Sequence, residues 1–172
     1  MSLFLSLVSI LKVFSTSLGV GTSTLAITNF FVAIADGFID ETERRMMGVV
    51  YVVLRIAMVA ILITTGILVA QEFSAVGFLT LAPVTYIQIV ILLTLYVNAL
   101  LMTAHLVSTT VGPALQAGSW YALGILLALQ STASADFTLT QFLLGYISWL
   151  VLAIGIVNGI MAVIKNNKHY HS

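Results

Sequence analysis

Five stretches of this chain are almost free of charged side chains, and this pattern limits the fold more than any other feature. They are residues 11–35, 46–70, 76–105, 113–130 and 137–164. Each is close to or longer than the roughly 20 apolar residues that a helix needs to cross a bilayer. Because 60% of all residues are hydrophobic and only 7% are charged, the chain cannot build a water-facing surface. We therefore predict an all-α, polytopic transmembrane helical bundle, with residues 1–172 as a single domain and short loops between the helices.

Composition also excludes several classes of function. The formal net charge is zero and no run of basic residues occurs, which argues against nucleic acid as a partner. Cysteine is absent, so disulfide bonds and thiolate metal sites are excluded. No serine–histidine–acid or metalloprotease pattern is present, and we expect a protein that is not an enzyme. The apolar opening residues precede Lys12, whereas a signal peptide has its basic residues first, so we expect them to begin the first helix.

Six of the twelve charged side chains fall between Asp36 and Arg45, in a segment with the features of a helix–turn–helix connection. Gly37 can adopt the left-handed conformation that ends a helix. Asp40 and Glu43 have the spacing of a capping box at the start of the next helix. We predict that these residues mark the turn of the first hairpin.

A weak cation site is the alternative interpretation of this segment, because it contains four carboxylates: Asp36, Asp40, Glu41 and Glu43. The spacing does not match a calcium-binding loop, which needs ligands at alternating positions over twelve residues. Glu41 also has the i,i+4 spacing of an ion pair with Arg45.

Basic residues predict the orientation of the bundle. With five helices, the charged loop and the C-terminus share one side, which holds four basic residues: Arg44, Arg45, Lys165 and Lys168. The other side holds Lys12, and we place Glu72 and Asp136 in loops there. The positive-inside rule puts the charged loop and the C-terminus in the cytoplasm and the N-terminus outside. We expect a bacterial inner membrane protein.

Arg55 is the ionisable residue that lies clearly inside a predicted span. Such a residue is a functional candidate because its transfer into the bilayer costs about 2.5–3.5 kcal/mol on insertion scales. It lies near mid-depth if the helix enters the membrane at Met46, and closer to the surface if the capped turns project into water. The alternative is a snorkelling arginine, or one satisfied by the amides of Asn29, Asn98 or Asn158. No carboxylate lies within a predicted span, so an anion fits this site better than a cation.

Polar residues also follow one face of several predicted helices. The third carries Gln88, Asn98 and His105 at separations of ten and seven, and the fourth carries Gln116 and Gln130. The fifth contains Gly155 and Gly159, a small-residue pair suited to helix packing. Two interpretations remain open for these faces, namely helix packing and a polar pocket.

Histidine is the remaining candidate ligand for a metal or cofactor. His105 is expected near the cytoplasmic end of the third helix, on the same side as His169 and His171. A haem with two axial histidines needs partners on two helices at matching depth. The chain offers His105 alone for that role, so we expect no cofactor.

Residues 11–70 resemble small bacterial membrane proteins related to the copper-resistance D (CopD-like) group. The resemblance is carried by Leu11-Lys12, Gly19, Gly21, Asp36-Gly37, Ile39 and Glu43. It implies a helical bundle and a connection to haem or copper. Ser15 stands where the family pattern has a histidine, so the resemblance supports the fold more than the cofactor.

Three hypotheses for function follow. The first is a small transporter or channel for an anionic or neutral solute, embedded in lipid and assembled as a homo-oligomer. Its pocket is expected between the second, third and fifth helices, with five solute-binding candidates: Arg55, Asn98, Gln88, Asn29 and Asn158. The second is an accessory or assembly subunit of a larger membrane complex. The third is a redox membrane protein that holds haem or quinone.

Overall fold

The structure is a computed structural model that describes residues 2–36, 40–108, 110–131 and 137–169. Within these ranges the chain forms five α-helices and one short 3-10 helix, η1 (Phe78–Thr80). The α-helices are α1 (Leu3–Asp36), α2 (Glu41–Val76), α3 (Pro83–Thr103), α4 (Val111–Ser131) and α5 (Leu139–His169). All five are long and apolar enough to cross a membrane, which confirms the predicted transmembrane helical bundle.

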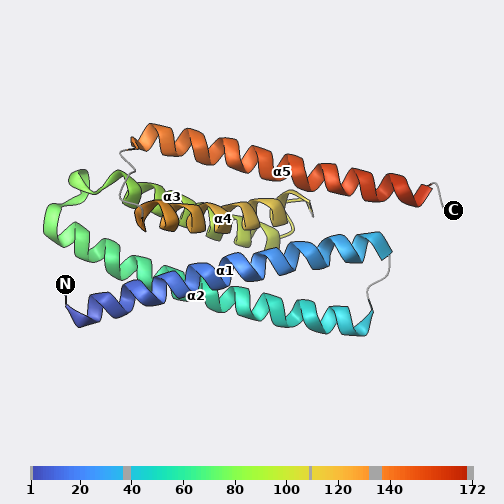
Figure 1. The fold of residues 1–172 in the computed structure, drawn as a ribbon, viewed down its shortest axis with the longest axis horizontal. Coiled ribbons are helices and arrows are strands. Elements are labelled where there is room, and N and C mark those ends of the chain that lie inside the picture. The colour runs from blue at the N-terminus through green and yellow to red at the C-terminus, as the bar shows by residue number, and fades with distance from the viewer. Residues whose placement is uncertain (1, 37–39, 109, 132–136, 170–172) are drawn as a thin grey trace.

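The helices pack in layers, with α4 at the centre (Figure 1). The antiparallel α1–α2 hairpin forms one side, the α3–α4 hairpin lies in the middle, and α5 covers the other side. α4 packs against α1, α3 and α5. In its most apolar stretch of 18 residues, 56% is buried, compared with 11% in the corresponding stretch of α5. The end of α1, the start of α2 and the C-terminal end of α5 lie at one end of the bundle, as the sequence predicts (Figure 1).

The helices differ in length, and this decides which residues lie at membrane depth. The 21 residues of α3 span about 32 Å, close to the roughly 30 Å hydrocarbon core. The 36 residues of α2 span about 54 Å. α1, α2 and α5 therefore extend past the α3–α4 turn at the end that holds the C-terminus (Figure 1).

The prediction of a third helix from residue 76 to residue 105 is wrong at its start. Gly77 ends α2 with a φ of +81°, in the left-handed region that favours glycine, and its N–H donates to the Phe73 carbonyl at 2.9 Å. Pro83 then starts α3, where its missing N–H has no intrahelical partner to lose. The first helix begins at Leu3, so the residues before the predicted span 11–35 start this helix, as the sequence predicts.

The predicted capping box at the start of α2 is confirmed. The Glu43 N–H donates to the Asp40 carboxylate at 2.6 Å, and the Asp40 N–H donates to the Glu43 carboxylate at 3.1 Å. Glu41 and Arg45 form the expected i,i+4 ion pair, at 3.4 Å between two exposed side chains. Gly37 and Ile39, like Asp136 and His171, lie outside the described residues, as do the side chains of Asp36, Lys165, Lys168 and His169.

We predict that Asp40→Ala lowers the free energy of unfolding by about 1 kcal/mol, because it removes one member of a two-way cap. Glu41→Ala is the matched control, since it removes only an exposed ion pair and should change stability by less than about 0.5 kcal/mol. Thermal unfolding of the detergent-solubilised variants measures both. Equal effects from the two substitutions would show that the cap contributes nothing beyond surface charge.

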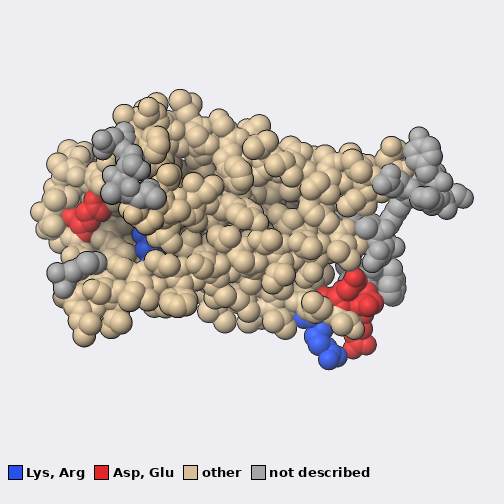
Figure 2. All heavy atoms as spheres, in the orientation of Figure 1, with Lys and Arg blue, Asp and Glu red and all other residues tan. Residues whose placement is uncertain are grey.

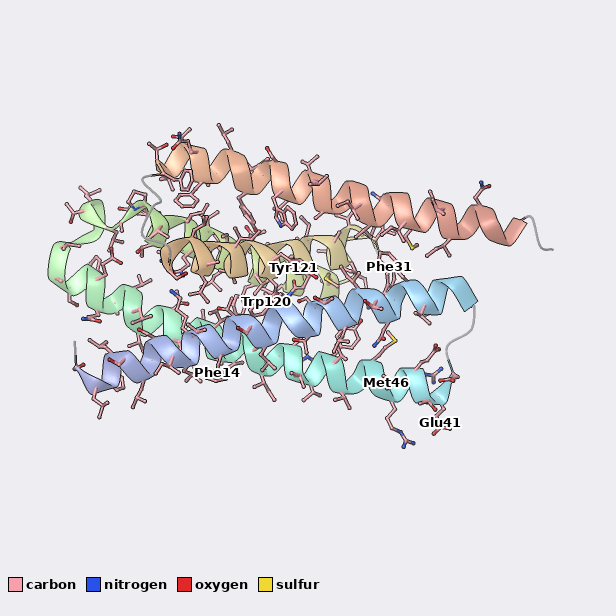
Figure 3. All side chains as sticks on the ribbon, in the orientation of Figure 1. Phe14, Phe31, Glu41, Met46, Trp120 and Tyr121 are labelled. Atoms are coloured by element: carbon pink, nitrogen blue, oxygen red, sulfur yellow. The ribbon has the colours of Figure 1, made fainter. Side chains whose placement is uncertain are left out.

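The centre of the bundle is built around Trp120 of α4, which is 0% exposed (Figure 3). Its ring packs directly on Gly19 of α1, where a Cβ atom would lie 2.2 Å from the ring carbons Cε3 and Cζ3. Two hydrogen bonds then join α4 to α5. Ser119 and the Tyr146 hydroxyl lie 2.9 Å apart, and the Trp149 indole N–H donates to the Gly118 carbonyl at 2.8 Å. Together these contacts fix α4 between α1 and α5.

Lys12 is buried inside the bundle, at 8% exposure, whereas the sequence interpretation used it as a marker of the outer side. The charge of the Glu72 carboxylate attracts its ammonium group. Glu72 lies in the last turns of α2, so its predicted place in a loop is wrong. Its two carboxylate oxygens accept hydrogen bonds from the Ala82 N–H at 2.8 Å and the Thr85 hydroxyl at 2.6 Å. These hydrogen bonds join the end of α2 to the start of α3.

Large apolar side chains cover the outer surface of the helices, including Phe14 and Val151. In Figure 2 the charged atoms gather at the two ends of the molecule, and the long surface between them carries none in that view. This distribution matches a protein whose middle lies in hydrocarbon and whose ends meet water.

Candidate functional site

The predicted functional residue Arg55 lines a cavity of about 360 Å³ that we call the Arg55 cavity. Its walls come from α1, α2, α3 and α4. Five of its fourteen lining residues carry a polar group on the side chain: Ser23, Tyr51, Arg55, Thr103 and Gln116. The predicted position between the second, third and fifth helices is therefore wrong, because α4 separates α5 from α2.

The Arg55 cavity lies toward the end of the bundle that holds the charged loop. The Tyr96 hydroxyl of α3 donates to the Met58 carbonyl of α2 at 2.5 Å, so these two residues are level. Arg55 lies about one turn beyond Met58, at the depth of the last two turns of α3. The first turns of α2 project past this level, so Arg55 lies nearer to the charged end of the bundle than to its middle. Its side chain is exposed at the mouth of the cavity.

The amides of Asn98 and Gln116 form a buried network behind this mouth. The Asn98 amide nitrogen donates to the Gly112 carbonyl at 2.9 Å. The nitrogen of this amide, and not its oxygen, therefore faces α4. The same nitrogen donates to the Gln116 side-chain oxygen at 3.1 Å. The Gln116 amide nitrogen is therefore turned the other way, toward the Met58 sulfur at 3.6 Å. A thioether is a weak acceptor, so Gln116 presents a largely unused N–H donor at the cavity.

Ser23 adds a second unused donor. Its side chain is 2% exposed, and its hydroxyl has no hydrogen-bond partner among the described residues. Other buried hydroxyls on α1 behave differently: Ser15 donates to the Leu11 carbonyl at 2.7 Å and Thr16 to the Lys12 carbonyl at 2.9 Å. A buried polar group without a partner is uncommon. Among the described residues, Thr65 Oγ1, Asn98 Oδ1 and Trp120 Nε1 share this property, and of these residues Ser23 alone lines the Arg55 cavity.

Arg55 provides the single formal charge among the residues that line this cavity. Glu72 is 17 positions further along α2, about 25 Å away along the helix axis, and its carboxylate is engaged at the other end of the bundle. The Arg55 cavity thus combines one cation with hydroxyl and amide donors and has no carboxylate in its lining. This arrangement favours an anionic group.

The structure does not bring the other predicted solute-binding residues into this cavity. Asn98 lies behind Gln116 and acts as a positioning residue. Gln88 is buried in the other half of α3, Asn29 is half-buried on α1, and Asn158 is exposed on α5. None of these four residues lines the Arg55 cavity.

His105 has a structural position instead of the predicted place on an inward-facing seam. It follows the last turn of α3 with a φ of +57°, and its side chain is exposed. The Leu106 N–H closes the helix end by donating to the Leu101 carbonyl at 2.9 Å. Within the described part of the chain, no three His, Asp or Glu side chains gather to hold a metal ion.

Gly155 and Gly159 do not pack against another helix of the bundle. Both are exposed, and a Cβ atom added at either position would meet nothing within 4 Å. Their predicted role in helix packing would therefore need a partner outside this chain.

A second cavity, of about 270 Å³, lies between α3, α4 and α5. Its lining is almost entirely aliphatic and aromatic, with Gln141 at its edge. It contains no charged side chain and offers no chemistry that would fix a solute.

Sequence reasoning missed Lys12 and Ser23 as interior residues. Both belong to one buried face of α1, which carries Lys12, Ser15, Thr16, Gly19, Thr22 and Ser23. Their separations of three or four residues are the signal that would have identified this face as the side toward the protein.

Comparisons with known protein families, curated proteins and solved structures found no match for this chain.

Proposed function

We propose that this protein is a small membrane transporter or channel-like protein for an anionic solute, and that the Arg55 cavity is its binding site. One observation carries the proposal: the same cavity is lined by Arg55, by Gln116, whose amide nitrogen has a weak sulfur acceptor, and by Ser23, whose hydroxyl has no partner, and its lining contains no carboxylate. Charge-assisted hydrogen bonds from arginine suit carboxylates, sulfonates and phosphates.

The proposed orientation in the membrane follows from the basic residues. With Arg44 and Arg45 in the cytoplasm of a bacterial cell, the Arg55 cavity would open near the inner surface of the plasma membrane. The polar face of α1, from Ser23 to Lys12, would then point from the cavity toward the other side of the bilayer.

Anion flux from proteoliposomes tests this function. Vesicles loaded with methanesulfonate, octanesulfonate or phosphate are diluted into anion-free buffer, and efflux is followed for the wild-type protein and two variants. Arg55→Ala is expected to reduce flux of the preferred anion at least about tenfold, because a hydrogen bond to a charged group is worth about 1.5–3 kcal/mol. Arg45→Ala removes an exposed arginine from the same helix and should leave flux unchanged. Full flux by Arg55→Ala, or no flux of any of the three anions by the wild type, would overturn the proposal.

An accessory subunit of a larger membrane complex is the second candidate, and α5 is the observation that favours it. Gly155 and Gly159 are exposed, and no atom lies within 4 Å of a Cβ added at either position. Asn158, which lies between them in the sequence, is also exposed. Small residues with a polar neighbour are typical of helix–helix interfaces in lipid. Native mass spectrometry of the purified protein separates the possibilities, since a second copy would fit an oligomeric transporter and a different protein would fit a subunit.

A further inference from the structure

We infer that the ligand of the Arg55 cavity is an oxyanion that carries an apolar tail, and that it enters sideways from the lipid. This inference rests on the proposed function, since it names the class of solute that the same cavity would take. Three features of the structure carry it: the position of Arg55 on α2, the composition of the cavity wall and the depth of the cavity.

Arg55 stands at the border between the lipid-facing surface of α2 and the cavity. Its neighbour Leu54 belongs to the buried core at 8% exposure, whereas Ile56 on its other side is 58% exposed. Val52 and Val59 continue the exposed apolar face one turn away in each direction. A guanidinium in this place is reached from the bilayer without passing through the interior of the bundle.

The wall of the cavity is mostly apolar. Nine of the fourteen lining residues have no hydroxyl, amide or charged group, among them Ile27, Phe30, Met58 and Met102. A small hydrated anion that enters would lose its water against these side chains and gain donors on one side only, which is unfavourable. An amphiphile avoids this loss, because its head replaces water with Arg55, Ser23 and Gln116 while its tail covers the apolar wall.

The depth of the cavity fits the same class of molecule. Arg55 lies level with the last two turns of α3. If the roughly 30 Å hydrocarbon core is centred on α3, these turns lie near its edge, where head groups meet acyl chains. Amphiphilic anions concentrate at this level of a bilayer because their charged ends stay near water and their tails lie in hydrocarbon. The mouth of the cavity therefore faces the layer in which such molecules are most abundant.

Alkyl sulfonates test the inference, because their charge does not change with pH. The protein is placed in nanodiscs of zwitterionic lipid and titrated calorimetrically with methanesulfonate and octanesulfonate, and the heat measured with Arg55→Ala nanodiscs is subtracted as partition into lipid. Octanesulfonate is expected to bind at least about a hundredfold more tightly than methanesulfonate, since each buried methylene contributes about fourfold. Equal binding of the two sulfonates, or no binding that depends on Arg55, would overturn the inference.

Two serines on the same buried face of α1 supply the matched variants. Ser23→Ala removes the unpartnered hydroxyl in the cavity and should weaken octanesulfonate binding about tenfold. Ser15→Ala removes a hydroxyl that already donates to the Leu11 carbonyl and should leave binding unchanged. The same loss from both variants would assign the effect to packing of α1 and contradict a contact between Ser23 and the ligand.

The source of the amphiphile is resolved by changing the lipid. A bilayer that contains phosphatidylglycerol repels octanesulfonate, so its partition into nanodiscs without protein is measured as a reference. If anionic bilayer lipids occupy the site, phosphatidylglycerol should weaken octanesulfonate binding more than it weakens this partition; if the ligand is a free amphiphile, the two should weaken equally. Both results support a tailed oxyanion. The flux assay and the binding assay can fail separately. Binding that depends on the tail, without flux, would support the tailed oxyanion and reject transport. Flux of methanesulfonate, with binding that does not improve with a tail, would support transport and reject the tailed oxyanion.

Discussion

Gly19→Ala is expected to lower the free energy of unfolding by about 3 kcal/mol, the largest effect of any single methyl group that the structure suggests. The added Cβ would lie 2.2 Å from two ring carbons of Trp120, a distance that real structures do not show. Trp120 is fully buried at the centre of the bundle, so its ring cannot move aside without displacing α4 from α1.

Gly21→Ala is the control for this prediction. It makes the same change two residues along the same helix, where a Cβ atom would meet nothing within 4 Å. Because glycine lowers helix stability by about 0.5–1 kcal/mol relative to alanine, Gly21→Ala should be neutral or slightly stabilising. Unfolding in mixed micelles measures both variants. If Gly19→Ala were as stable as Gly21→Ala, the close packing of Trp120 on α1 would be wrong.

Glu72→Gln is expected to destabilise the fold by about 1 kcal/mol, because it removes the carboxylate charge that attracts the Lys12 ammonium from beyond ion-pair distance. Glutamine keeps the shape of the side chain and an oxygen that can accept from the Ala82 N–H. The Thr85 hydroxyl can accept a hydrogen bond from the new amide nitrogen. The expected loss therefore reports the charge rather than the hydrogen bonds.

A double-mutant cycle separates this charge effect from local packing. Lys12→Met alone should be close to neutral, since it removes the buried charge and leaves the half-buried Glu72 with both of its hydrogen-bond donors. Lys12→Met combined with Glu72→Gln should recover most of the stability that Glu72→Gln loses. A double variant that is as unstable as Glu72→Gln would show that Lys12 and Glu72 are not coupled.

The spans could be predicted from sequence because each helix must satisfy its backbone internally in lipid, which leaves a long apolar run as a clear signal. The capping box of Asp40 and Glu43 was equally visible, since it depends on contacts within four residues. The start of α3 was harder to locate. The apolar segment continues through Gly77, and only the combination of a left-handed glycine with Pro83 shows where one helix ends and the next begins.

The candidate site was predicted in part. Arg55 could be predicted because a charged residue inside an apolar segment is visible in the sequence itself. Ser23 could not, because its environment depends on how α1 packs, and three other small polar residues, Ser15, Thr16 and Thr22, share its spacing pattern. The role of Asn98 could not be predicted, because it depends on the Gly112 carbonyl and Gln116 lying beside it. These are contacts between α3 and α4. The same limit applies to Lys12, whose burial follows from the packing of three helices.

The central position of α4 has a consequence for how the chain enters the bilayer during synthesis. α4 is the least apolar of the five spans, and its polar residues Gln116 and Ser119 are unfavourable in contact with lipid. Asn98, the hydrogen-bond partner of Gln116, lies in α3 and emerges from the ribosome before α4, so the two helices can insert as a pair. Tyr146, the partner of Ser119, lies in α5 and is made later. Ser119 also donates to the Leu115 carbonyl within α4. We therefore expect α3 and α4 to insert as a hairpin, with α5 packing against α4 afterwards.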